Sequence, residues 1–214
     1  MTWAYTPRVD LRVYFAESPV VAFVMAHGAG GGQMSRFIVE AATGLAARGV
    51  ATATFDFPYV TAGRRVPDKG PVLEAAWRDA IQEGRRTFPS LPLAIGGKSM
   101  GGRIASHVAS QGGAGPLAGL LFFGYPLHPP GTPDRRRDAH LPAIAEPMLF
   151  LQGTRDQFGT AEEIRALLPS LQRATLHEID GGDHSFKVPG GQAKQGPVMA
   201  GLLDTAAAWL ASLR

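Results

Sequence analysis

Short apolar runs alternate with helical stretches along almost the whole chain, and this alternation is the feature that most constrains its fold. The runs of strand length are 9–15, 20–25, 50–55, 91–96, 118–123, 147–151 and 174–179. Helices are expected at 34–47, 71–87, 100–110, 161–168 and 196–213. Such alternation requires right-handed crossovers, which build a mostly parallel sheet covered by helices on both faces. We therefore expect an α/β fold of about seven strands, with the first strand pairing antiparallel at one edge.

Length and composition indicate one domain spanning residues 1–214. A chain of 214 residues with 45% hydrophobic content can bury one sizeable core, and no internal repeat or second domain is visible. The absence of cysteine excludes disulfides, thiolate metal sites and a cysteine nucleophile. Residues 1–8 lack a signal pattern, and the early apolar run is too short for a membrane span. We therefore expect a soluble cytoplasmic protein without a membrane partner.

The charge pattern argues against a nucleic-acid partner. The formal net charge is +3 and the basic residues are scattered, without a basic stripe and interleaved aromatic residues. The triplet Arg135–Arg137, which lies among prolines, has two interpretations. It is either a solvated loop or a rim that attracts anionic substrates.

A Gly-x-Ser-x-Gly sequence, Gly97 to Gly101, lies between an apolar run and a helical stretch. In this context the serine occupies a sharp strand-to-helix turn that exposes its hydroxyl, and the flanking glycines leave room for it. Ser99 is therefore the candidate nucleophile. The run Gly97-Lys98-Ser99 does not complete a phosphate-binding loop, because Pro92 occupies the position of the first glycine. Lys98 is expected to be partly exposed beside the site.

An acid and a histidine follow Ser99 in the order that this turn predicts. Asp156 comes just after the run 147–151, and His184 lies in a glycine-rich loop after the run 174–179. The carboxyl ends of parallel strands meet at one edge of a sheet, so these side chains can converge there with Ser99. Asp183 and then Asp180 are the alternative acids, although their places near His184 in sequence suggest that they brace its loop. Ser99, His184 and Asp156 then form a candidate nucleophile, base and orienting acid.

A further glycine-rich loop, His27 to Gly32, follows the run 20–25. Its amides and the amide after the serine could stabilise an oxyanion, and we assign this role to Ala29 and Met100, with Gly28 or Gly30 as alternatives to Ala29. His27 is expected to order this loop. The segment 124–146 is short and rich in proline and arginine, which predicts an open cleft. Its expected borders and substrate contacts are Gly28, His27, Tyr125, Leu127 and His128, with Phe57 and Tyr59 as further candidates.

These motifs resemble those of the α/β-hydrolase superfamily over residues 9–213. Three of them, Gly-Gly-Lys-Ser-Met-Gly-Gly-Arg at 96–103, Phe-Gly-Tyr-Pro-Leu-His-Pro-Pro at 123–130 and Leu-Gln-Gly-Thr-Arg-Asp at 151–156, are similar to the small lidless branch related to dienelactone hydrolases. That branch also includes a vertebrate chromatin-complex subunit. Dienelactone hydrolases use a cysteine nucleophile, which this chain lacks.

The resemblance implies a serine hydrolase that cleaves a carboxylic ester of a small molecule, without a cofactor or a metal. Two alternatives stay open. The chain could be a non-catalytic scaffold that binds a protein or a small ligand. It could also be a thioesterase or peptidase, because the same side chains serve acyl transfer in general. The sequence does not indicate an oligomeric state.

Overall fold

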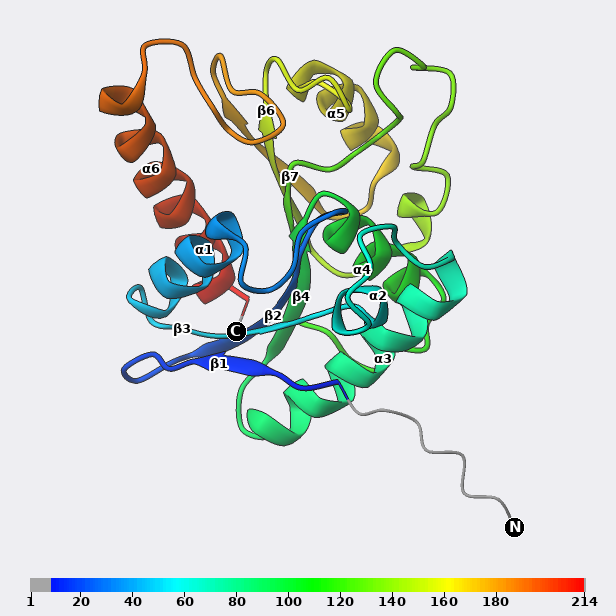
Figure 1. Cartoon of the computed structure of the whole chain (residues 1–214), viewed down its shortest axis with the longest axis vertical. Helices are drawn as coiled ribbons and strands as arrows, with labels where there is room; N and C mark the ends of the chain where they lie inside the picture. The colour runs from blue at the N-terminus through cyan, green and yellow to red at the C-terminus, as the bar shows by residue number, and fades with distance from the viewer. Residues whose placement is uncertain (1–8, 214) are drawn as a thin grey trace.

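The computed structural model describes residues 9–213, and within them the strands form one seven-stranded sheet in the order β1-β3-β2-β4-β5-β6-β7 (Figure 1). The strands are β1 (Arg12–Tyr14), β2 (Val21–Ala26), β3 (Val50–Phe55), β4 (Leu93–Lys98), β5 (Gly119–Phe123), β6 (Met148–Gly153) and β7 (Ala174–Ile179). Strand β1 pairs antiparallel with β3 at the edge, and the other neighbours are parallel. The expected α/β fold and its antiparallel edge strand are thus confirmed.

All five expected helices are present, with their ends shifted by a few residues. They are α1 (Arg36–Ala46), α3 (Gly70–Thr87), α4 (Met100–Ser110), α5 (Ala161–Leu167) and α6 (Gln192–Ala211). The sequence did not predict α2 (Pro58–Thr61) or the 3₁₀ turns η1 (Leu141–Ala143) and η2 (Leu168–Ser170). These segments are too short to show a helical period of apolar residues.

Helices cover both faces of the sheet and enclose two apolar cores. Figure 1 shows α1 and α6 together on one face, where Ile38 and Leu202 pack against the strands. On the other face, α3, α4 and α5 bury Trp77, Ile104 and Ile164. The strands of such a sheet are buried on both sides, which explains why β2 reads as a continuous apolar run and why every residue of β3, including its two threonines, is buried.

Two glycines set the position of α4 against the sheet. A Cβ at Gly97 or at Gly101 would overlap the carbonyl oxygen of Ala26 on β2, so only glycine permits this approach. The Trp77 indole N–H donates to the Gly101 carbonyl at 3.0 Å and fastens α3 to the same turn. The N-terminus of α4 therefore lies at the carboxyl end of the central strands.

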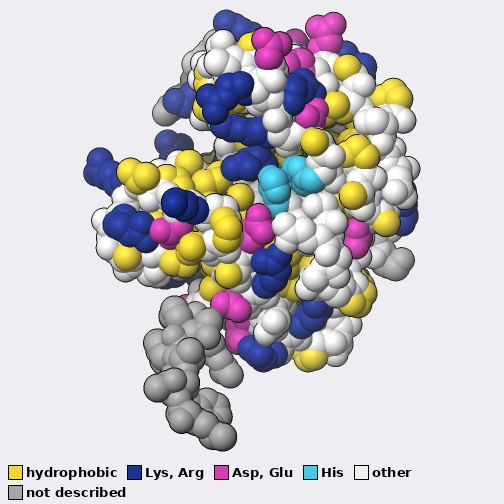
Figure 2. Space-filling model, turned by 90° about the vertical axis from the view of Figure 1, so that its right-hand side faces the viewer, with side chains coloured by type: hydrophobic (Ala, Val, Ile, Leu, Met, Phe, Trp, Pro, Cys, Tyr) yellow, Lys and Arg dark blue, Asp and Glu magenta, His cyan; other side chains and the backbone are white. Residues whose placement is uncertain are grey.

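The connection between β5 and β6 is mostly irregular and, in the part of the chain that the structure describes, carries no helical cap domain. The face that is turned to the viewer in Figure 2 shows histidine side chains near its middle, with Lys and Arg side chains close by. No helix within residues 9–213 is both long and apolar enough to cross a bilayer.

Candidate active site

Ser99 lies in the turn between β4 and α4 in a backbone conformation that residues with a Cβ rarely adopt. Its φ is 50° and its ψ is −116°, and its N–H donates to the Phe123 carbonyl of β5 at 3.1 Å. Backbone strain of this kind persists only where the surroundings impose it, here through the close packing of α4 on β2. The turn presents the Ser99 side chain, which is partly exposed, at the carboxyl end of the sheet.

His184 and Asp156 form a hydrogen-bonded chain with Ser99. The His184 Nδ1 lies 2.7 Å from Asp156 Oδ2, and its Nε2 lies 2.8 Å from Ser99 Oγ. An ionised carboxylate only accepts hydrogen bonds, so Nδ1 carries the proton and Nε2 accepts from the Ser99 hydroxyl. The structure thus brings together three side chains that the sequence separates by up to 85 positions.

The Asp156 side chain is buried, and both of its carboxylate oxygens accept hydrogen bonds. Its Oδ1 accepts from the Phe158 N–H at 2.8 Å, and its Oδ2 accepts from the Gln152 side-chain amide at 2.9 Å. Gln152 also accepts from the Tyr125 N–H at 2.8 Å. Sequence reasoning missed Gln152, which lies on β6 among apolar residues, although a glutamine inside a buried strand signals a polar partner. The carboxylate therefore has a fixed orientation toward His184.

The surroundings of His184 favour a neutral imidazole. Burial lowers the pKa of His184 below its usual value, and the charge of Lys98 lowers it further, while the hydrogen bond to Asp156 raises it. A neutral imidazole with its proton on Nδ1 can take a proton on Nε2. The Phe158 ring lies 4.2 Å from the imidazole ring, centroid to centroid, and limits its movement.

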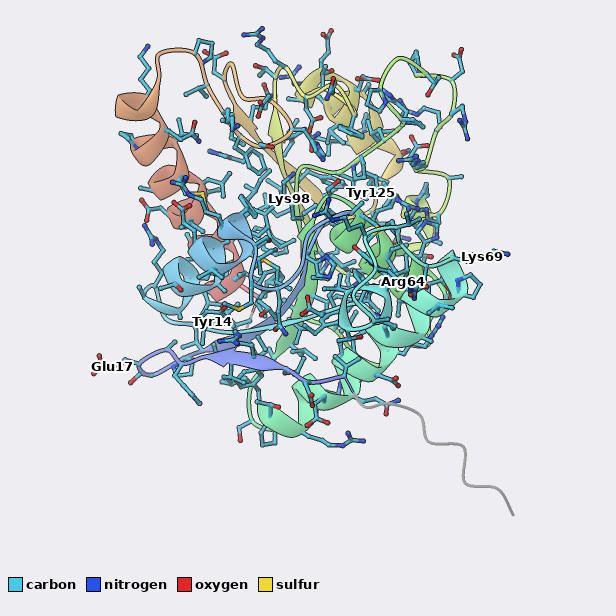
Figure 3. The ribbon with its side chains drawn as sticks, in the orientation of Figure 1. Tyr14, Glu17, Arg64, Lys69, Lys98 and Tyr125 are labelled. Carbon is cyan, nitrogen blue, oxygen red and sulfur yellow. The ribbon has the colours of Figure 1, made fainter. Side chains whose placement is uncertain are left out.

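Lys98 turns its ammonium group inward beneath the loop that carries His184. The residue, which is labelled in Figure 3, is partly exposed, as expected. Its Nζ donates to the His184 carbonyl at 2.5 Å and lies 5.3 Å from the centroid of the Phe186 ring. Burial lowers the pKa of Lys98 to about 8, and the charges of Asp156 and Asp183 oppose this shift. No sequence pattern indicated this contact, because it joins two residues that meet only in the folded chain.

The loop after β2 approaches Ser99 and offers a free amide. A Cβ at Gly28 would lie 3.5 Å from the Cβ of Ser99. The His27 Nδ1 donates to the Gly28 carbonyl at 2.8 Å, and its Nε2 accepts from the Phe57 N–H at 3.2 Å, so His27 fixes the loop from the interior. Among the described residues, the N–H groups of Ala29 and Met100 have no hydrogen-bond partner. Both residues line the same cleft as Ser99, so both amides are candidates to bind an oxyanion.

The cleft beside Ser99 has a volume of about 510 Å³. Its lining includes Arg103, His107, Pro126, Arg137 and Phe158. Of these, only Arg137 had been considered, because it belongs to the triplet Arg135–Arg137 that was interpreted as either a solvated loop or a rim that attracts anionic substrates. Arg103 was missed, although it follows Ser99 by one helical turn, a spacing that could have indicated a shared surface.

The side chains expected to border this cleft face the interior, which corrects that prediction. Tyr125 and Leu127 are fully buried and His128 is almost fully buried. The Tyr125 hydroxyl donates to the Arg137 carbonyl at 3.0 Å, and the His128 Nε2 lies 3.1 Å from a Glu163 carboxylate oxygen. The chain after β5 folds back over the core, so its aromatic side chains fill the interior. His27, Phe57 and Tyr59 are likewise fully buried.

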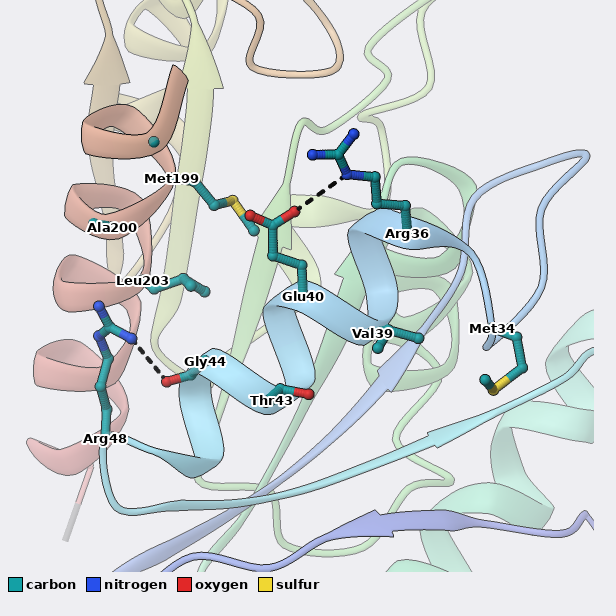
Figure 4. Close-up of a pocket in the computed structure, with 11 residues that line it drawn as sticks. Met34, Arg36, Val39, Glu40, Thr43, Gly44, Arg48, Met199, Ala200 and Leu203 are labelled. Atoms are coloured by element: carbon teal, nitrogen blue, oxygen red, sulfur yellow. Dashed lines mark hydrogen bonds and ion pairs between the residues drawn. The ribbon is translucent and has the colours of Figure 1, made fainter. Parts of the chain in front are cut away.

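A second groove, of about 830 Å³, lies between α1 and α6 (Figure 4). It is lined by residues such as Met34, Glu40 and Met199, and it contains none of the predicted site residues. Within residues 9–213 no three His, Asp or Glu side chains are grouped so that they could hold a metal ion.

The chain matches one protein-family model and is similar to several solved structures. A family model described as an alpha/beta hydrolase domain matches residues 19–211. A lidless α/β serine hydrolase from Xanthomonas campestris is similar at 22% identity, with 94% of this chain and 89% of that chain covered and a TM-score of 0.70. A dienelactone hydrolase from Anabaena variabilis is similar at 19% identity, with 94% and 90% covered and a TM-score of 0.73. A serine hydrolase homologue from Coxiella burnetii is similar at 17% identity, with 92% and 91% covered and a TM-score of 0.73.

Proposed function

The chain belongs to the α/β-hydrolase domain family, and on that premise we propose that it is a serine hydrolase that cleaves carboxylic esters of small molecules. The observation that carries the proposal is the hydrogen-bonded chain from Ser99 Oγ to His184 Nε2 and from His184 Nδ1 to Asp156 Oδ2, at 2.8 and 2.7 Å. Ser99 also stands in the strained turn where such nucleophiles occur. A scaffold that only binds a ligand would not require this combination of features.

In the proposed reaction, the Ser99 oxygen attacks the ester carbonyl carbon while His184 Nε2 takes the hydroxyl proton. Asp156 keeps the proton of the imidazole on Nδ1 and stabilises the imidazolium that forms. The negative charge on the carbonyl oxygen is bound by the amides of Ala29 and Met100. The N-terminus of α4 adds a favourable dipole at the same place. His184 then donates its proton to the leaving alcohol, and an acyl group remains on Ser99.

Water completes the cycle. His184 takes a proton from a water molecule whose oxygen attacks the acyl carbon, and collapse of the second intermediate returns that proton to Ser99. The net reaction consumes one ester and one water and releases one carboxylic acid and one alcohol. No redox change occurs, so the proposal needs no cofactor.

The proposal is tested with a chain-length series of p-nitrophenyl esters. The protein should release p-nitrophenol from short-chain esters, and Ser99→Ala should reduce kcat by about 10³-fold or more. Ser110→Ala serves as the matched control, because Ser110 is the last residue of α4 and its hydroxyl bonds only to the His107 carbonyl. A binding scaffold would show no turnover, and its behaviour would not change on replacement of Ser99. Thioester and peptide substrates measured in parallel separate the other acyl-transfer activities.

A further inference from the structure

Two arginines line the cleft beside Ser99 and come from different parts of the chain. Arg103 lies on α4, and its N–H donates to the Ser99 carbonyl at 3.0 Å. Arg137 lies on the connection between β5 and β6. Its N–H donates to the Leu127 carbonyl at 2.8 Å, and its carbonyl accepts from the Tyr125 hydroxyl at 3.0 Å. The backbone of each arginine is therefore held in place, so that both side chains border a defined cleft.

Neither arginine has a carboxylate partner among the described residues, whereas three other arginines nearby do. Arg64 pairs with Asp68 at 2.7 Å, Arg78 lies 3.7 Å from Glu74, and Arg136 pairs with Asp138. Asp68 and Glu74 also line the cleft, but these ion pairs offset their charges. Arg103 and Arg137 are the arginines that line the cleft, and their positive charges have no carboxylate partner among the described residues.

The guanidinium of Arg103 also has an unused donor. One terminal nitrogen, Nη1, lies 3.3 Å from His107 Nε2, while Nε is buried without a hydrogen-bond partner. Because Nε is buried, a carboxylate in the cleft would contact the terminal nitrogens of Arg103 rather than Nε. An anionic ligand is therefore indicated by the two positive charges that line the cleft without a carboxylate partner.

The charge of Arg103 also acts on its neighbours. Burial is the largest cause that lowers the pKa of His107 and of His140, and Arg103 lowers both further. Arg103 and Arg135 likewise lower the pKa of Arg137, after burial. The rings of His107 and His140 are stacked, with their centroids 3.9 Å apart. Their lowered pKa values favour neutral rings, so neither histidine balances the positive charge of Arg103.

We infer that the ester substrate carries a carboxylate group, which Arg103 and Arg137 bind in the cleft while the ester carbonyl lies at Ser99. The inference rests on the proposed function and names its substrate class. A guanidinium presents a planar fork of N–H donors that fits a carboxylate, and two guanidinium groups can donate to both of its oxygens. The carboxylate takes no part in the bond changes. It fixes the distance between the anion and the scissile carbonyl, and so selects half-esters of dicarboxylic acids.

A matched pair of esters isolates the charge. One is the mono-p-nitrophenyl ester of glutaric acid, and the other is the same compound with its free carboxylate capped as a methyl ester. We expect kcat/KM to favour the charged ester by about tenfold or more, because a hydrogen bond to a charged group contributes about 1.5–3 kcal/mol. Arg103→Met and Arg137→Met should each reduce this ratio by about tenfold. Arg173→Gln, which removes an exposed charge before β7, should leave the ratio unchanged.

The ratio of kcat/KM for the charged ester to that for the capped ester distinguishes the esterase proposal from the inference that the substrate carries a carboxylate. If Ser99→Ala abolishes turnover of the capped ester while the charged ester has no advantage, the esterase function stands and the inference is wrong. Arg137 lies on a loop, so Arg137→Met tests the inference even if Arg103→Met does not fold. Equal ratios in the wild type and in folded arginine variants would overturn it.

A binding measurement tests the cleft without catalysis. Titration of glutarate into the Ser99→Ala variant, followed by calorimetry, should give saturable binding that Arg137→Met weakens about tenfold and that added salt weakens further. This result would support the anion site even if no ester were hydrolysed. An absence of glutarate binding to a folded Ser99→Ala variant would contradict the inference.

Discussion

The Lys98 ammonium group donates a hydrogen bond to the main-chain carbonyl of His184 at 2.5 Å, so the residue next to the proposed nucleophile holds the loop of the proposed base. This contact crosses 86 positions of sequence, and Lys98 is not among the residues that line the cleft. Lys98 is also close to Asp156, since a Cβ at Gly124 would lie 3.0 Å from Lys98 Nζ and 3.5 Å from Asp156 Oδ2. Its charge therefore acts on both partners of Ser99.

Replacement of Lys98 should alter both the rate and its pH dependence. In Lys98→Met, the His184 loop loses its anchor, and we expect kcat to fall on the order of tenfold. Loss of the positive charge removes one cause that lowers the pKa of His184, so the acid limb of kcat/KM should move to higher pH. The pH profiles of Lys98→Met and of the control Lys187→Met, an exposed lysine on the same loop, measure both effects. A reduced rate with an unmoved acid limb would mean that Lys98 acts only structurally.

The activity of the unmodified protein should be lost in acid with a midpoint below pH 6.5. Burial and Lys98 lower the pKa of His184 below the usual histidine value of about 6.5, and only the neutral imidazole can accept the Ser99 proton. Activity is therefore present above this lowered pKa and disappears as the pH falls through it. Steady-state kcat/KM between pH 4 and 8 reports the midpoint. An acid limb at or above pH 6.5 would contradict the electrostatic description of His184.

The acid that orients His184 can be identified by two conservative variants. Asp156→Asn should reduce kcat by about 10³- to 10⁴-fold, because an amide no longer favours the correct tautomer of the imidazole. Asp183→Asn should have a much smaller effect, since Asp183 Oδ1 only accepts from the Ser185 and Lys187 amides, at 2.7 and 2.9 Å, and asparagine retains an acceptor oxygen. Equal losses in the two variants would mean that Asp183 shares the role of Asp156.

Two glycine substitutions test how α4 is placed. Gly101→Ala should destabilise the protein by several kcal/mol, on the order of 2–4, because its Cβ would overlap the main chain of Ala26. Gly201→Ala, in α6 with no atom within 4 Å of the added Cβ, should stabilise it slightly, by up to about 1 kcal/mol. Urea denaturation of both variants measures the difference. A Gly101→Ala variant as stable as the wild type would show that α4 can move away from β2 without cost.

The fold and the positions of Ser99, Asp156 and His184 could be predicted from the sequence for the same reason. Parallel strands with buried faces produce continuous apolar runs, and their carboxyl ends meet at one edge, so polar residues just after those runs converge. The direction of side chains on irregular segments could not be predicted in this way. Tyr125 and Leu127 follow β5 and were expected at the cleft, but their apolar surface is buried in the core.

Contacts that depend on the direction of a single side chain also could not be predicted from the sequence. Lys98 sits between an exposed turn and the interior, and only the placement of Phe186 and the His184 carbonyl turns its ammonium inward. Arg103 and Arg137 share a cleft because the connection after β5 folds toward α4, a path that no periodic pattern encodes. Short irregular connections thus determine the lining of the site, while the regular elements determine its position.

The most direct test of the proposed function is labelling with a fluorophosphonate, read by intact mass and peptide mapping. We predict a single adduct, located on Ser99, in the wild type. This adduct should be absent in Ser99→Ala and in wild-type protein that is denatured before labelling. An adduct on another residue, or labelling that persists in Ser99→Ala, would contradict the assignment of the nucleophile. No adduct on the folded protein, together with no turnover of short-chain esters, would show that the chain is a binding scaffold rather than a serine hydrolase.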